Sequence, residues 1–145
     1  LETAAGELRI VASSPAPPRR IVIVEDNEDV RTGVKHLLEL DGHEVFEASD
    51  GRAGLDTILR VRAEIAVIDI GLPVLDGLDV ARAVRAALGQ SITLVAMTGY
   101  GNRADRHKGV DAGFDHYLVK PVDTVALRAV LVQNAGDARL PSTAA

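Results

Sequence analysis

The sequence has 145 residues, and 16 Lys and Arg against 21 Asp and Glu give it a formal net charge of −5. This length suits one compact domain, and an apolar content of 47% is too high for a chain that is disordered throughout. The lack of cysteine excludes disulfides and thiolate metal sites, the short apolar runs exclude a membrane-spanning helix, and the acidic balance disfavours a nucleic-acid-binding protein. We therefore expect a soluble, cytoplasmic domain that itself contacts neither nucleic acid nor membrane, although a parent protein could carry a membrane anchor.

The two ends of the chain differ in composition from the part between them. Residues 1–18 include the proline-rich stretch 13–18, which is typical of a semi-extended linker, and residues 136–145 are small and polar. We predict a linker or tail over 1–18, a folded domain over 19–135 and a second tail over 136–145. Because the sequence starts without Met, we expect a fragment or a processed form of a longer protein.

Within the folded domain, strand patterns alternate with helix patterns. The apolar run 21–24 ends in acidic residues and is typical of a strand that is buried on both faces. A helix follows, because apolar residues recur at helical spacing between Asn27 or Glu28 and a stop at Asp41-Gly42. The same alternation predicts strands over 44–48, 65–70, 92–98 and 116–120, and helices opened by Asp50-Gly51 and over 78–88, 103–112 and 125–132. Five βα units with short loops predict a doubly wound α/β domain with a parallel sheet.

The residues that end the predicted strands point to the chemistry. Ligands of such folds collect beyond the carboxyl ends of the strands. The first strand ends in Glu25-Asp26, the third in Asp69, the fourth in Thr98 and the fifth in Lys120. Three carboxylates that lie together repel one another unless a cation sits among them, and hard oxygen ligands suit Mg²⁺. A lysine and a hydroxyl beside such a site favour a phosphoryl ligand, and a carboxylate between metal and lysine can form an acyl phosphate.

Four motifs in register make the sequence resemble a response-regulator receiver domain. They are IVIVEDNE at 21–28, AVIDIGLP at 66–73, AMTG at 96–99 and YLVKP at 117–121, and the resemblance covers about residues 19–135. It implies a flavodoxin-like (βα)5 fold with strand order 2-1-3-4-5 and a role in two-component signalling. The later motifs look most like receivers that are attached to hybrid sensor histidine kinases.

The resemblance also implies a role for each matching acidic residue. Asp69 is the expected phosphoacceptor, which attacks the phosphoryl group of a partner's phosphohistidine. Mg²⁺ is expected to bind Asp26, Asp69 and the backbone carbonyl of Gly71 directly, and Glu25 through a water molecule. The expected partner is a histidine kinase or a histidine phosphotransfer protein.

The remaining matching residues are expected to respond to phosphorylation. Lys120 pairs with the acids and binds the phosphate, Thr98 closes over the phosphoryl oxygens, and Tyr117 swings inward when Thr98 moves. This movement would alter the surface of the fourth helix, fifth strand and fifth helix, through which a homodimer could form. The Lys120–Pro121 bond is expected to be cis, and the domain to be a switch rather than a metabolic enzyme.

Several alternatives stay open on the sequence alone. A pseudo-receiver would keep the fold and bind proteins without phosphate. A Mg²⁺ phosphohydrolase would need an acid two positions after Asp69, where glycine stands, and no phosphate-binding glycine loop follows the first strand as in a nucleotide-binding module. Taken singly, Asp69 could cap a turn, Lys120 could be a solvated strand end, Thr98 could cap a loop and Tyr117 could pack with a hydrated hydroxyl.

Overall fold

The computed structural model of the chain describes residues 17–99 and 103–137, with the side chains of residues 17–99 and 107–132. The strands are β1 (Arg20–Val24), β2 (Glu44–Ala48), β3 (Ile65–Asp69), β4 (Thr93–Thr98) and β5 (His116–Val119). The helices are α2 (Glu28–Leu40), α3 (Gly51–Val61), α4 (Gly77–Leu88), α5 (Arg103–Ala112) and α6 (Thr124–Asp137). The predicted tails fall largely outside the described residues. The last helix, however, runs to Asp137 and is longer than the predicted 125–132.

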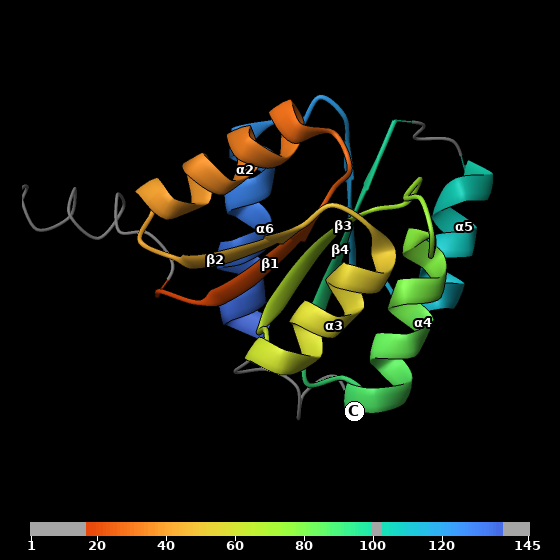
Figure 1. Cartoon of the computed structure of the whole chain (residues 1–145). Coiled ribbons are helices and arrows are strands. Elements are labelled where there is room, and N and C mark those ends of the chain that lie inside the picture. The colour runs from red at the N-terminus through yellow and green to blue at the C-terminus, as the bar shows by residue number, and fades with distance from the viewer. Residues whose placement is uncertain (1–16, 100–102, 138–145) are drawn as a thin grey trace, which may run out of the picture.

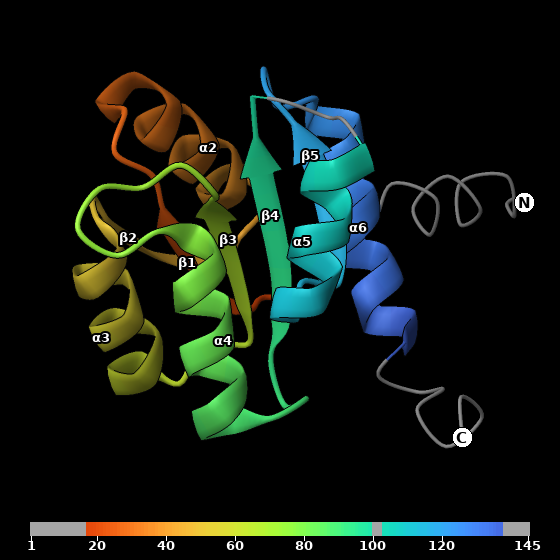
Figure 2. The same ribbon diagram turned by 90° about the vertical axis from the view of Figure 1, so that its right-hand side faces the viewer.

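The five strands form one parallel sheet in the order β2-β1-β3-β4-β5. This arrangement confirms the predicted doubly wound fold and its strand order. Helices α2 and α6 cover one face of the sheet, and α3, α4 and α5 cover the other (Figure 1). The arrows of β3 and β4 end at the same edge (Figure 2). The strand order reverses between β1 and β3, which makes the carboxyl edge of these two strands the expected place for a ligand.

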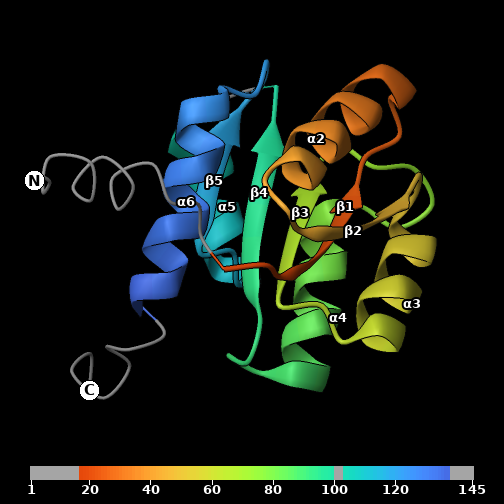
Figure 3. The ribbon, with the colours of Figure 1, turned by 90° about the vertical axis from the view of Figure 1, so that its left-hand side faces the viewer.

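Two apolar layers join the helices to the sheet. Ile21 packs with Leu38 and Leu127 in the layer under α2 and α6, the two helices that share a face in Figure 3. Val22 packs with Ile58 in the opposite layer, under α3, α4 and α5. Neighbouring residues of the central strands therefore enter different layers, which explains why these strands read as continuous apolar runs.

The first helices begin at side-chain caps at the carboxyl edge of the sheet. Asn27 accepts a hydrogen bond from the Val30 N–H (3.0 Å), and Asp50 and Asp76 cap α3 and α4 in the same way. Such caps satisfy backbone N–H groups that have no partner in the first turn. The predicted strands 65–70, 92–98 and 116–120 each include one residue more than the observed strand. Just past β3 and β5, the N–H groups of Ile70 and Lys120 still donate to the neighbouring strand. None of the helices in the described residues is long and apolar enough to cross a membrane.

Candidate functional site

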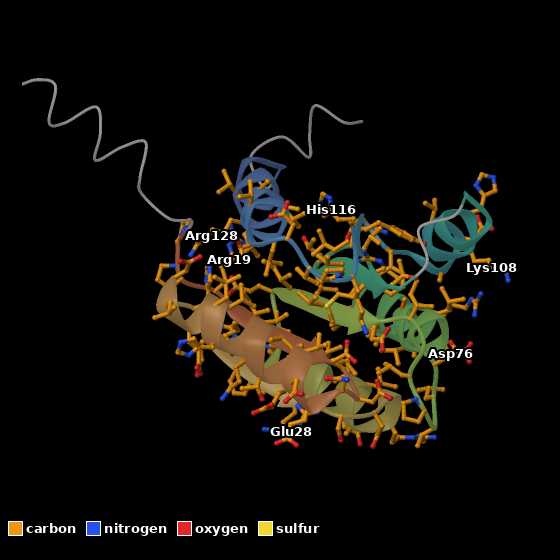
Figure 4. The ribbon with its side chains drawn as sticks, turned by 90° about the horizontal axis from the view of Figure 1, so that it is seen from above. Arg19, Glu28, Asp76, Lys108, His116 and Arg128 are labelled. Carbon is orange, nitrogen blue, oxygen red and sulfur yellow. The ribbon has the colours of Figure 1, made fainter. Side chains whose placement is uncertain are left out.

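Three acidic side chains meet beyond β1 and β3. Glu25 and Asp26 directly follow β1, and Asp69 is the last residue of β3. One carboxylate oxygen of each residue lies within 4.8 Å of the others. Glu25 is fully buried and Asp69 nearly so, whereas Asp26 is exposed. Figure 4 looks down on this edge of the sheet, with Glu28 at the start of α2 and Asp76 directly before α4. The cluster therefore combines an enclosed part with access for solvent at Asp26.

Lys120 brings an ammonium group into this cluster from the end of β5. Its Nζ atom lies 2.6 Å from Oε1 of Glu25 and 3.3 Å from Oδ2 of Asp69. Burial disfavours the charged lysine, but the two carboxylates outweigh this effect and raise the pKa of Lys120. The predicted meeting of Lys120 with Asp69 is thus observed. Since one ammonium faces three carboxylates, the cluster keeps an excess of negative charge.

Glu25 is the most enclosed of the three acids. Its Oε2 atom accepts a hydrogen bond from the Asn27 N–H (3.0 Å), while Oε1 pairs with the ammonium of Lys120. Burial raises the pKa of Glu25, and the charge of Asp69 acts in the same direction, against Lys120 and the Asn27 N–H. Carboxylate ligands and surplus negative charge together fit a hard divalent cation such as Mg²⁺.

Close backbone packing fixes the position of Asp69. The Gly71 N–H donates to Oδ1 of Asp69 (3.2 Å), so that the two carboxylate oxygens have separate partners. The Gly77 N–H donates to the Ile70 carbonyl (3.0 Å) at the start of α4. A Cβ atom on Gly77 would overlap the Asp69 carbonyl oxygen and lie 2.7 Å from the Cα of Ile70. Glycine at 77 therefore allows α4 to begin directly against the end of β3.

Thr98 and Tyr117 lie on the strands beside the cluster. Thr98 ends β4, is nearly buried, and pairs in register with Val119, while Tyr117 pairs with Ala96. Side chains two positions apart on a strand share a face, and Ala96 and Tyr117 both belong to the layer under α3, α4 and α5. The half-buried Tyr117 ring meets Phe114 edge-on, with ring centroids 6.4 Å apart. Thr98 and Tyr117 thus face the same layer, as a coupled pair requires.

The backbone of β5 connects this pair to Lys120. The Lys120 N–H donates to the Thr98 carbonyl (2.8 Å), which places the two residues side by side at the carboxyl edge. The Lys120–Pro121 bond is cis, as the resemblance predicts. The chain between Thr98 and α5, with Tyr100, lies mostly outside the described residues.

Sequence reasoning missed Arg31 of α2. Its Nη1 atom donates to the Glu25 carbonyl (3.0 Å), and its Nε atom donates to Glu47 (2.9 Å). Arg31 thereby holds the backbone from which two of the acids project. The available signal was a basic residue one turn after the Asn27 cap, on a helix that begins beside an acidic strand end.

Comparison of this sequence with known families and proteins identifies response regulators. The model of the response regulator receiver domain matches residues 21–132. The response regulator MprA of Mycolicibacterium vanbaalenii is 38% identical over 104 residues, which are 72% of this chain and 45% of MprA. MprA of Mycobacterium avium is 37% identical over 102 residues, 70% of this chain and 44% of that protein. The chain thus spans about half the length of these curated relatives.

Solved structures give the same result. The receiver domain of the sensor histidine kinase PA1611 from Pseudomonas aeruginosa, which has a magnesium ion coordinated in its active-site cleft, is 30% identical with a TM-score of 0.76. That similarity covers 83% of this chain and 99% of the solved chain. The chemotaxis protein CheY4 of Vibrio cholerae is 26% identical with a TM-score of 0.75, over 81% of this chain and 98% of the other. Each similarity covers nearly all of the solved domain.

Proposed function

The chain belongs to the response-regulator receiver family of two-component signalling, and from this premise we propose that Asp69 accepts the phosphoryl group. The donor is a phosphohistidine on a histidine kinase or a histidine phosphotransfer protein. An Asp69 oxygen forms the new bond to phosphorus while the bond from phosphorus to the histidine nitrogen breaks, and the nitrogen keeps the electron pair. The observation that carries this proposal is the position of Asp69 at the switch point, with its Oδ2 atom 3.3 Å from Lys120.

Mg²⁺ is the cofactor in this proposal. Asp26, Asp69 and the Gly71 carbonyl would hold it directly, and Glu25 would hold it through water. When bound, Mg²⁺ neutralises part of the acidic cluster and of the charge on the phosphoryl oxygens. The acidic cluster of Glu25, Asp26 and Asp69 and the magnesium ion in the cleft of the PA1611 receiver domain support this assignment.

Lys120 and Thr98 stabilise the phosphorylated form. A phosphoryl group brings about −1.5 to −2 charges to Asp69, so that the Lys120 ammonium and the Thr98 hydroxyl gain an acceptor beside them. Tyr117 follows Thr98 and thereby changes the surface formed by α5, β5 and α6. Exposed valines on all three elements give this surface apolar contacts for a second copy of the domain: Val110, Val119 and Val125.

A pocket beside Lys120 supports docking of the partner that carries the histidine. Its volume is about 300 Å³, and its mostly apolar walls come from α2 and from the chain after β5. The residues that line it are Asp29, Val30, Gly33, Val34, Leu37, Lys120, Pro121, Val122 and Thr124. Because Lys120 contacts Asp69, a partner segment bound in this pocket lies next to the phosphoacceptor.

We further propose that the domain extends over residues 19–135 and on to the end of α6 at Asp137. We propose that it is located in the cytoplasm. We also propose that it acts as a switch rather than as a metabolic enzyme.

Acetyl phosphate and Mg²⁺ provide the test. We expect the domain to gain one phosphoryl group by intact-mass spectrometry, and expect the Asp69→Asn variant and a chelator-treated sample to gain none. The Asp56→Asn variant is the matched control, because Asp56 is an exposed acid of α3 away from the cluster. Phosphorylation of the Asp69→Asn variant would refute the assignment. No phosphorylation of the unaltered domain would favour a pseudo-receiver that binds proteins without phosphate.

A further inference from the structure

The edge of the Tyr117 ring lies in a notch on α5 at Gly109. A Cβ atom built on Gly109 would overlap the hydroxyl oxygen and the Cζ atom of Tyr117 and lie 2.8 Å from its Cε1 atom. Real Cβ atoms essentially never come within 3.0 Å of a heavy atom outside their own and the adjacent residues. Any side chain at 109 therefore forces the ring or the helix to move. Gly109 itself is buried. The ring therefore packs directly on the backbone of α5.

Glycine is an unfavourable choice at this position on helical grounds alone. Gly109 lies inside α5 (Arg103–Ala112), where glycine has the lowest helix propensity of any residue except proline. Gly33 of α2 offers a comparison, because a Cβ atom there would meet nothing within 4 Å. The packing of the Tyr117 ring therefore explains glycine at position 109, whereas no such contact explains glycine at position 33.

The other neighbours of the ring define where Tyr117 can go. Phe114 contacts it edge-on at an interplanar angle of 75°. Ala96 faces Tyr117 in register on β4, and Thr98 follows two positions later on the same face. Of the side chains along β4, only the small one of Ala96 therefore stands between the ring and Thr98. The ring thus lies in the notch of α5 beside Ala96, and Thr98 lies farther along β4 toward the carboxyl edge.

We propose that Gly109 is a positioning residue for Tyr117, and that the passage of the ring out of this notch transmits phosphorylation to α5. The inference rests on the proposed function, because it takes Tyr117 as the residue that follows Thr98. A side chain at 109 keeps the ring out of the notch whether or not Asp69 is phosphorylated. The exposed Val110 beside Gly109 belongs to the surface that this movement changes.

A double-mutant cycle on the unphosphorylated domain tests the notch. We expect Gly109→Ala to lower the urea midpoint of unfolding when Tyr117 is present, and to raise it when it is combined with Tyr117→Ala, because the helix then gains propensity without the overlap. The control Gly33→Ala should raise the midpoint in both backgrounds. If Gly109→Ala raises the urea midpoint in both backgrounds, the packing of Tyr117 against Gly109 is refuted. The combined variant keeps the test valid if Gly109→Ala alone folds poorly.

Tyrosine fluorescence tests the link to phosphorylation. The chain has two tyrosines and no tryptophan, so the emission of a Tyr100→Phe protein comes from Tyr117. With acetyl phosphate and Mg²⁺, we expect acrylamide quenching of Tyr117 to change in this protein but not after Gly109→Ala, although both gain a phosphoryl group by mass. An equal change in both proteins overturns the positioning role. If neither protein gains a phosphoryl group, the proposed function and the transmission both fail, while the folding cycle still decides whether the notch exists.

Discussion

The two ends of the parallel sheet hold their charged groups in opposite ways. At the carboxyl end, Glu25, Asp26 and Asp69 lie together and Lys120 supplies the ammonium among them. Burial raises the pKa of Glu25, which shows that its charge is held at a cost. The carboxylates at this end of the sheet therefore outnumber the ammonium that pairs with them.

At the amino end, acceptors surround the guanidinium of Arg85. Arg85 of α4 donates to the carbonyls of Gly89, Ile92 and Gly113 at 2.7 to 3.0 Å and to the carboxylate of Asp115 at 2.7 Å. These partners belong to the segments that lead into β4 and β5. The guanidinium thus ties α4 to the segments that lead into two strands, and its Nε, Nη1 and Nη2 atoms all have acceptors.

The difference teaches that stability and chemistry are separated along the strands. A fully paired guanidinium strengthens the fold but offers nothing to a ligand. An acidic cluster with one ammonium carries repulsion between like charges, and its oxygens stay available to a ligand. Substitutions at the two ends should therefore act in opposite directions on stability.

The largest effect is expected from Arg85→Met. We expect the free energy of unfolding to fall by about 2–4 kcal/mol, because the part-buried carbonyls of Ile92 and Gly113 lose a charged donor and Asp115 keeps the Leu94 N–H but loses the guanidinium. Urea denaturation measures this loss. The control is Arg82→Met on the same helix, whose pair with Asp79 is more than half exposed and should contribute within about 0.5 kcal/mol. Equal losses for the two variants would contradict the contrast between the ends.

The carboxyl end was largely predictable from the sequence, and the amino end was not. Parallel strands bring their last residues to one edge, so Asp26, Asp69 and Lys120 could be placed together from the strand pattern alone. Arg85 gave no such signal, because most of its partners are backbone carbonyls, and every residue has one. The type of a residue does not indicate whether a side chain elsewhere contacts its backbone carbonyl.

The same limit applies within the candidate site. The sequence marked Glu25 as a metal ligand, but it did not reveal that Glu25 lies nearer to Lys120 than Asp69 does. The need for glycine at 109 depends on where the Tyr117 ring points, which is a matter of packing between two elements. The movement of Thr98 and Tyr117 stays a prediction, because one conformation of the domain contains no information on the other.

The second effect in size is expected from Asp69→Asn without metal. We expect stability to rise by about 1 kcal/mol, because one of three clustered negative charges is removed while Lys120 keeps its 2.6 Å pair with Glu25. Adding Mg²⁺ should raise the thermal midpoint of the unaltered domain more than that of the variant. Asp56→Asn should respond like the unaltered domain. An Asp69→Asn variant that is less stable without metal would mean that the acidic cluster stabilises the fold.

The smallest effect is expected from pH, which changes the stability contributed by the two ends of the sheet in opposite directions. His43, directly before β2 at the amino end, is buried, and its Nδ1 atom accepts a hydrogen bond from the Arg19 N–H (3.1 Å). Burial lowers the pKa of His43, and Arg19 adds to this effect against the nearby Asp41 and Glu64. The unfolded chain takes up a proton near the ordinary value of 6.5 and the folded domain does not. Stability at this end is therefore lost as the pH falls from about 6.5 toward the pKa of folded His43.

Glu25 at the carboxyl end has the opposite sign. Its pKa is raised in the folded domain, so the stability from its bound proton is present below the ordinary value of 4.5 and is lost as the pH rises through the folded value. Unfolding free energies at pH 7.5 and 5.5 separate the two groups. We expect the unaltered domain to lose up to about 1 kcal/mol on acidification, and His43→Asn, which keeps an acceptor but does not titrate there, to lose less. The exposed His36→Asn variant should behave like the unaltered domain. An equal loss in the His43→Asn variant would assign the acid sensitivity to a group other than His43 and other than Glu25, which acts in the reverse direction.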